Sequence, residues 1–250
     1  MLKPLLDLLF PIPSLDGGEG QWITEDEWTS LANLESIYLT QSQLRKMGCT
    51  DLETVIAAAD YETSPLLRKA IRTLKYKRIP ALSHMLSFLM INAASNLLML
   101  PGESTPVLCP IPLHWTRRFQ RGFNQAQLLA ADIGREKNWP VEQLIVRTRP
   151  TGHQAWRNRE QRLKAVNNAF QIHARSLRSS SEKLLTSQAN ISSESFESSE
   201  SLESSESFPA PATVILVDDL LTTGATMQAC AAALKKAGIK RVIGLTVARG

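Results

Sequence analysis

The chain has 250 residues, with 28 Lys and Arg against 24 Asp and Glu and a formal net charge of +4. These figures are typical of a globular protein with one or two domains and a real hydrophobic core. The net charge is too small to indicate a nucleic-acid partner by itself. The three cysteines lie far apart without a CxxC pair, which excludes a disulfide framework and favours a reducing cytoplasm.

The charges are segregated along the chain. Residues 114–175 contain twelve Lys and Arg against four Asp and Glu, whereas residues 176–212 contain two against six. The second segment repeats Ser and Glu with almost no aliphatic residue, so it cannot bury enough surface to offset the entropy of ordering. We therefore expect residues 176–212 to be a disordered insertion, either a neutral linker or a phosphorylated regulatory tether.

The N-terminal part has weaker patterns, and residues 1–60 are expected to form a small, loosely defined helical region. The opening MLKPLLDLLFPIP is interrupted by an acidic residue and two prolines, so no export signal is expected. Polar residues likewise interrupt the apolar stretch 81–100, which predicts a buried helix and no membrane span. Ser64 is expected to cap a helix that begins with Pro65. Helical apolar spacing is found at Leu52, Val55, Ile56, Leu66, Leu67, Ile71, Leu74, Leu82, Leu86 and Leu89.

Strand and helix patterns alternate in the rest of the chain. We expect strands at 104–113, 141–147, 168–173, 214–218 and 240–248, and helices at 122–138 and 225–237, the second closed by Gly238. This alternation predicts an α/β fold with an open, mostly parallel sheet flanked by helices. Ligands of such sheets bind at the carboxyl ends of the strands.

One such end carries the most informative motif, VILVDDLLTTGATM at residues 214–227. Asp218 and Asp219 are expected at the strand's end, where the chain turns and both side chains reach one crevice. A carboxylate pair can accept hydrogen bonds from vicinal sugar hydroxyls and can hold a hydrated divalent cation. The alternative is an acidic strand end of structural importance only.

The residues after the acidic pair predict an anion site. Thr222, Thr223 and Thr226 offer hydroxyl groups, and Gly224 lets the backbone N–H groups close around an anion. A helix that begins near Ala225 points its positive end at the same place. The alternative is an ordinary helix cap. No GxxxxGK or GxGxxG motif is present, which argues against a P-loop or a dinucleotide site.

The whole string resembles the motif with which type I phosphoribosyltransferases bind 5-phosphoribosyl 1-pyrophosphate (PRPP). A second stretch, PIPLHWTRRFQRGFNQAQLLA at 110–130, resembles the competence protein F (ComF) family, also described as amidophosphoribosyltransferase-like, and contains its RGFNQ signature at 121–125. KYKR at 75–78 and RTRPTGHQAWRNREQRLKAVNNAF at 147–170 resemble further segments of that family. The resemblance covers residues 65–175 and 213–250, which predicts a phosphoribosyltransferase-like domain at 61–175 and 213–250.

The resemblance implies a protein that binds PRPP or a related ribose phosphate together with Mg²⁺. Arg118, Arg121 and Gly122 are then expected to hold pyrophosphate at the start of the helix at 122. Phosphoribosyl transfer with release of pyrophosphate is the implied reaction, although the sequence leaves both the acceptor and the retention of catalysis open. Two features depart from the family, since its N-terminal zinc-binding cysteine cluster is missing, so that no protein metal site is expected, and Ala165 replaces an Asn.

The same resemblance leaves a second class of function open, an accessory factor of natural transformation. Such a protein would handle incoming single-stranded DNA or contact the uptake machinery from the cytoplasm. The basic span 114–175 carries Trp115, Phe123 and Trp156, which could stack on bases while Lys and Arg contact phosphates.

Overall fold

The computed structural model describes residues 15, 23–77, 79–95, 105–113, 119, 121–148, 169–173 and 211–250. Almost all of the predicted insertion at 176–212 lies outside these residues. The described elements are α2 (Glu25–Ala32), β1 (Ile37–Leu39), α3 (Gln41–Lys46), β2 (Thr54–Asp60), α4 (Pro65–Tyr76), α5 (Pro80–Ala94), β3 (Val107–Pro110), α7 (Gln125–Lys137), β4 (Ile145–Arg147), β5 (Phe170–Ile172), β6 (Thr213–Leu221), α10 (Ala225–Lys236) and β7 (Arg241–Arg249).

Five of the described strands form the central sheet, in the order β1-β2-β7-β6-β3. The pairs β2–β7, β7–β6 and β6–β3 are parallel, and β1 pairs antiparallel with β2 at one edge. The strands β4 and β5 form a separate antiparallel pair. The predicted open, mostly parallel α/β sheet is therefore confirmed, with β6 one strand from the edge.

The prediction of helical structure around Leu52, Val55 and Ile56 is wrong. These residues lie in or just before β2, which pairs in parallel with β7 over its length. The sequence TVIAAAD is apolar at every inner position because both faces of the strand are covered, so it has no alternation to distinguish it from a helix. As a result, β1 and β2, which precede residue 61, belong to the central sheet.

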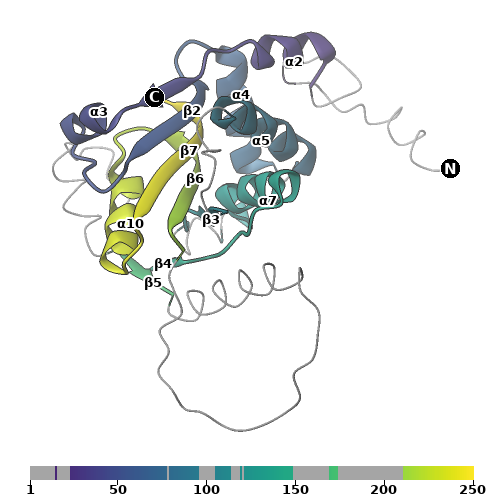
Figure 1. Ribbon diagram of the computed structural model, residues 1–250. Coiled ribbons are helices and arrows are strands. Elements are labelled where there is room, and N and C mark those ends of the chain that lie inside the picture. The colour runs from purple at the N-terminus through teal and green to yellow at the C-terminus, as the bar shows by residue number, and fades with distance from the viewer. Residues whose placement is uncertain are drawn as a thin grey trace, which may run out of the picture.

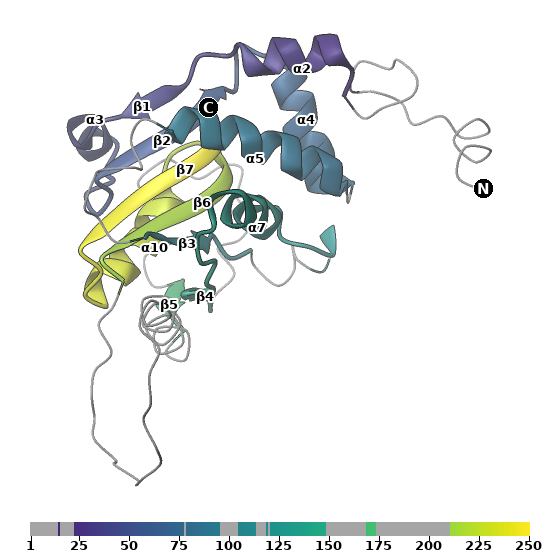
Figure 2. The ribbon, with the colours of Figure 1, turned by 45° about the vertical axis from the view of Figure 1, so that its right-hand side comes forward.

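Helices cover both faces of the sheet (Figures 1 and 2). Residues of α4, α5 and α7 form a hydrophobic cluster with one face, and residues of α3 and α10 form a second cluster with the other face and with the β4–β5 pair. The odd-numbered Ile215 and Val217 of β6 belong to the first cluster, and the even-numbered Val214 and Leu216 to the second. The first half of β6 is thus buried on both sides, as a central parallel strand requires.

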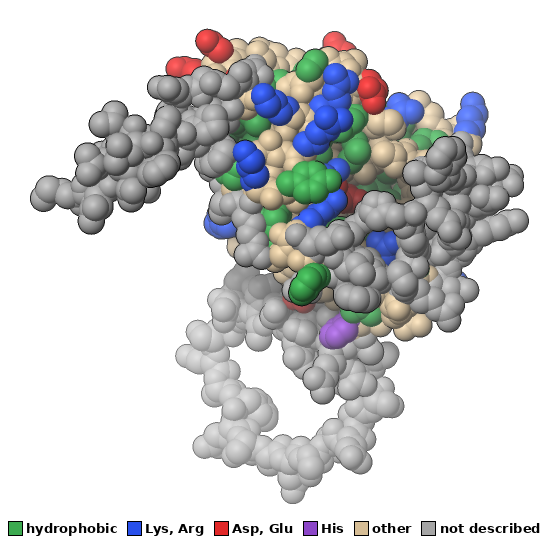
Figure 3. Space-filling view, turned by 180° about the vertical axis from the view of Figure 1, so that it is seen from behind, with side chains coloured by type: hydrophobic (Ala, Val, Ile, Leu, Met, Phe, Trp, Pro, Cys, Tyr) green, Lys and Arg blue, Asp and Glu red, His purple; other side chains and the backbone are tan. Residues whose placement is uncertain are grey.

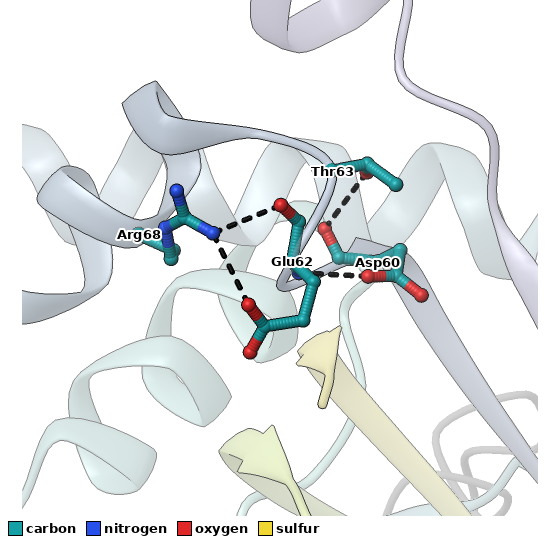
Figure 4. A network of polar contacts seen from close by, with 4 residues as sticks. All are labelled: Asp60, Glu62, Thr63 and Arg68. Carbon is teal, nitrogen blue, oxygen red and sulfur yellow. Dashed lines mark hydrogen bonds and ion pairs between the residues drawn. The ribbon is translucent and has the colours of Figure 1, made fainter.

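The start of α4 is fixed by local polar contacts. Ser64 accepts a hydrogen bond from Leu67 N at 3.1 Å, with Pro65 in the first turn, which confirms the predicted cap. In the preceding turn, Asp60 Oδ1 accepts from Glu62 N at 2.7 Å, and Arg68 donates to the main-chain oxygen of Glu62 at 2.9 Å (Figure 4). These contacts set where α4 leaves the sheet, and hence where its last turn lies.

The apolar helix predicted within 81–100 is confirmed as α5, Pro80–Ala94. None of the helices in the described ranges is both long enough and apolar enough to cross a lipid bilayer.

Candidate functional site

The acidic pair lies within β6. The strand continues to Leu221, which pairs with Arg249 of β7, so the prediction that Asp218 and Asp219 end the strand is wrong. The physical reason is that β7 is long enough to pair with Leu220 and Leu221, beyond the acidic pair. Both acids still lie near the carboxyl end of β6, the edge at which parallel sheets bind ligands.

The carboxyl groups of the pair lie together, although a regular strand would direct consecutive side chains to opposite faces. Val217 and Leu220 both pack on the hydrophobic cluster next to α4 and α7, three residues apart, so the alternation is interrupted between them. Asp218 and Asp219 occupy this interruption. Their side chains are close enough to affect each other's ionisation, and Asp219 N donates to Asp218 Oδ1 at 2.9 Å.

Asp219 is held by two helices. The Lys75 ammonium group, in the last turn of α4, lies 2.8 Å from Asp219 Oδ2, and the side chains are 18% and 6% exposed. Gln125 Nε2, at the start of α7, donates to Asp219 Oδ1 at 3.5 Å. Asp219 is therefore an almost fully buried carboxylate with a contact on each oxygen.

The surroundings of Asp218 disfavour the ionised form of its carboxyl group. Burial raises its pKa well above the usual range, the charge of Asp219 raises it further, and the positive charge of Lys75 opposes both. The residue nevertheless keeps part of its surface exposed. On the α10 side lies Cys230, and burial, followed by the neighbouring Cys109 and Asp218, raises the pKa of its thiol. The carboxyl group thus sits between a buried acid and a buried neutral thiol.

The turn after β6 leads into α10 through Gly224, which has a φ angle of 75°. Thr222 is exposed, and Thr223 and Thr226 are partly exposed. The N-terminus of α10 has no hydrogen bond from a capping side chain, although Thr223 Oγ1 accepts from Ala225 N at 3.5 Å. Such an N-terminus combines main-chain donors with the positive end of the helix dipole, which suits a phosphate.

Two glycines bring this N-terminus close to the sheet and to the N-terminal part of the chain. A β-carbon on Gly224 would lie 2.6 Å from Cys49 Sγ. A β-carbon on Gly244 of β7 would lie 2.4 Å from Met227 Sδ, in the first turn of α10, and 2.9 Å from Val55 of β2. The position of the turn therefore depends on small residues on both sides of it.

The predicted pyrophosphate residues are only partly brought together. Arg121 lies over the ring of Tyr76, 5.7 Å from its centroid, which connects the segment before α7 to the end of α4. Gly122 lies before the helix, because α7 begins at Gln125 and not at 122 as predicted. Asn124 caps it, accepting from Ala126 N at 3.1 Å, so the chain itself uses part of the expected anion cradle. Arg118 lies outside the described residues.

The described carboxylates could bind a cation only if a ligand supplied most of the coordinating oxygens. Among the residues that the structure describes, no group of three or more His, Cys, Asp and Glu could hold a metal ion. Two carboxylates at one place are, however, compatible with Mg²⁺, which commonly keeps waters and binds one or two carboxylates together with substrate phosphates.

Sequence reasoning gave no role to Lys75 or Gln125, the two partners of Asp219. Lys75 had a detectable signal, because it lies four residues after Ile71 and one after Leu74, both fully buried, on the inner side of α4. A Lys at such a position needs an acidic partner nearby. Gln125 was marked only by its place in RGFNQ at 121–125, since the residue after a helix cap is not restricted in type.

Comparisons with known proteins agree with this geometry. Residues 166–250 match the family model of the phosphoribosyl transferase domain, a range that includes β6, the turn and α10. The chain is also 26% identical over 136 residues to competence protein F of Haemophilus influenzae. That match covers 54% of this chain and 46% of the relative, so the chain spans about half the length of the curated protein that it matches.

The parallel sheet, the acidic pair on β6 and the matching domain model define a protein with the phosphoribosyltransferase fold. Within that class, the chain is similar to competence protein F of Haemophilus influenzae and carries RGFNQ at 121–125.

Proposed function

We propose that this protein binds PRPP, or a related ribose phosphate, together with Mg²⁺ at the carboxyl end of β6. The observation that carries the proposal is the direct succession of the carboxyl pair, the Gly224 turn and the α10 N-terminus without a capping side chain. This succession provides acceptors for sugar hydroxyls on one side and donors for a phosphate on the other.

Different residues would contact different parts of the ligand. The acidic pair provides a carboxylate acceptor for the ribose hydroxyls, and the turn 222–226 donates to the 5-phosphate through main-chain N–H groups and threonine hydroxyls. Arg121 approaches the pyrophosphate from its place over Tyr76. Bound Mg²⁺ would neutralise negative charge on the phosphate oxygens.

The reaction that this arrangement supports is displacement of pyrophosphate. The bond from the anomeric carbon to pyrophosphate oxygen breaks, a nitrogen acceptor forms a new bond to that carbon, and pyrophosphate leaves with the bonding electrons. The chain contributes orientation of the ribose and stabilisation of the departing charge. The acceptor is the part of the reaction to be identified by assaying pyrophosphate release with a panel of nucleobases.

The double variant Asp218→Asn/Asp219→Asn is expected to abolish Mg-dependent PRPP binding, because neutral amides lose the charge-assisted hydrogen bonds to the hydroxyls. Isothermal titration calorimetry of the full chain with PRPP and Mg²⁺ measures this. Glu53→Gln is the matched control, since Glu53 pairs with Arg241 at 2.7 Å at the opposite end of the parallel strands. Unchanged affinity of the double variant would refute the proposed site.

The second candidate is a role in natural transformation through single-stranded DNA. The exposed side of α4 carries Lys69, Arg72 and Tyr76, and the Tyr76 side chain is 75% exposed beside Arg121. Lys and Arg side chains also gather on the face shown in Figure 3. Cations around an exposed ring can contact phosphates while a base stacks on the ring. The name of the relative in Haemophilus influenzae, a competence protein, favours the same role.

A salt titration tests this candidate. Arg72→Ala is expected to weaken binding of a single-stranded oligonucleotide and to reduce the slope of log K against log salt by about 0.7, the value for one lost phosphate contact. Lys46→Ala, which removes an exposed charge from α3 on the other side of the sheet, should leave the slope unchanged. Equal slopes for Arg72→Ala and the wild type would exclude α4 as the binding surface.

A further inference from the structure

The two acids of the motif differ in what surrounds them. Asp219 has a 6% exposed side chain and contacts Lys75 and Gln125, whereas Asp218 remains partly exposed. Lys75 itself is only 18% exposed, so the ion pair is shielded from water and from salt. Separating it would leave an uncompensated buried charge, which is far more costly than losing a surface pair. We therefore expect Asp219 to stay paired with Lys75 when a ligand binds.

Each oxygen of Asp219 contacts a side chain of the protein. Oδ2 forms an ion pair with the Lys75 ammonium group at 2.8 Å, without a hydrogen bond of regular geometry from the described residues, and Oδ1 accepts from Gln125 Nε2 at 3.5 Å. Gln125 is 2% exposed, and its Oε1 has no hydrogen-bond partner among the described residues. The amide is therefore buried at the start of α7, away from solvent. Because the Asp219 side chain is only 6% exposed, a ribose hydroxyl has far less access to it than to the partly exposed Asp218.

We infer that Asp218 alone presents its carboxylate to the ligand, and that Lys75 and Gln125 are positioning residues that hold Asp219 behind it. This inference rests on the proposed ribose-phosphate site and divides the roles within it. Asp219 fixes Asp218 through its main-chain N–H, which donates to Asp218 Oδ1 at 2.9 Å, and through the contact between the two side chains. Lys75 compensates one of the two negative charges, so that the other can face the sugar.

The contacts of Asp219 lie where α4 ends and α7 begins. Lys75 is in the last turn of α4 and Gln125 is the first residue of α7. One buried carboxylate therefore connects β6 to two helices of that layer, α4 and α7. Disturbing Lys75 is expected to change ligand affinity without any direct contact between its ammonium group and the ligand.

Calorimetry with PRPP and Mg²⁺ on five variants of the full chain separates the roles. Asp218→Asn is expected to lose on the order of 100-fold in affinity, as for charge-assisted hydrogen bonds, and Asp219→Asn about 10-fold or less. Lys75→Met should lose more than Asp219→Asn, because it leaves the buried carboxylate unpaired. The neutral pair Lys75→Met/Asp219→Asn should recover to about the affinity of Asp219→Asn, and Lys75→Arg should stay close to the wild type.

Each outcome has a defined meaning. Losses for Lys75→Met and Asp219→Asn that simply add in the double variant would mean that Lys75 contacts the ligand, which would overturn the inference. An Asp219→Asn variant as weak as Asp218→Asn would overturn it too. If the wild type binds no PRPP, the proposed function itself is wrong. Arg241→Met, which breaks the Glu53 pair elsewhere, is the control for loss of an ion pair, and Lys75→Arg keeps the test valid if Lys75→Met does not fold.

Discussion

Replacing Gly224 with alanine is expected to reduce PRPP affinity on the order of 100-fold and to lower stability by about 2–4 kcal/mol. Two effects add at this position. A non-glycine residue at a φ angle of 75° is strained, and its β-carbon would lie 2.6 Å from Cys49 Sγ. Relief of either strain moves the turn, and with it the N–H groups at the start of α10. Calorimetry and urea unfolding measure the two losses.

Gly238 offers a matched control, because it has a φ angle of 90° and a β-carbon added there would meet no described atom within 4 Å. The loss of unfolding free energy in Gly238→Ala therefore measures the effect of the left-handed backbone alone, at the far end of the same helix. Adding Cys49→Ala to Gly224→Ala should return the stability loss toward that of Gly238→Ala, since the alanine removes the sulfur atom. A double variant no more stable than Gly224→Ala would show that contact with Cys49 is not the cause.

The local features of the site could be predicted from sequence because short-range chemistry determines them. A buried strand, an acidic pair, a glycine turn and a helix from residue 225 are all encoded within residues 214–238. Ser64 was recognisable as a helix cap for the same reason, since its partner is only three residues away. Such features depend on hydrogen-bonding geometry and backbone sterics that act within one or two turns.

The features that the sequence did not reveal depend on contacts between distant segments. Lys75 and Asp219 are 144 positions apart in the numbering, and only the packing of α4 against the sheet brings them together. β2 was mistaken for helix because its hydrogen bonds go to β7, almost 190 positions later, and its apolar residues face covering layers on both sides. The prediction that α7 begins at residue 122 was wrong because the Asn124 side chain caps the helix, which therefore begins at Gln125.

The Asp218→Asn variant is expected to be more thermostable than the wild type at pH 8, even though it loses ligand affinity. The pKa of Asp218 is raised in the folded protein above its ordinary value of 3.8, so folding has to hold an unfavourable charge at any pH above the folded pKa. Asparagine has nearly the same shape without that charge, and it also relieves the repulsion of Asp219. Each kcal/mol of gain raises the Tm by roughly 2–4 °C in a chain of this size.

The sign of the pH dependence identifies the cause. As the pH falls through the folded pKa of Asp218, the folded wild type takes up a proton before the unfolded chain does, which stabilises it relative to the variant. The advantage of Asp218→Asn should therefore shrink with falling pH and vanish once the unfolded carboxyl is also protonated, below about pH 4. Asp132→Asn, at a buried acid that accepts from Ser83 at 2.7 Å, should show no gain. Thermal unfolding between pH 4 and pH 8 measures both, and a gain for Asp218→Asn that is equal at the two ends would exclude ionisation of Asp218 as its origin.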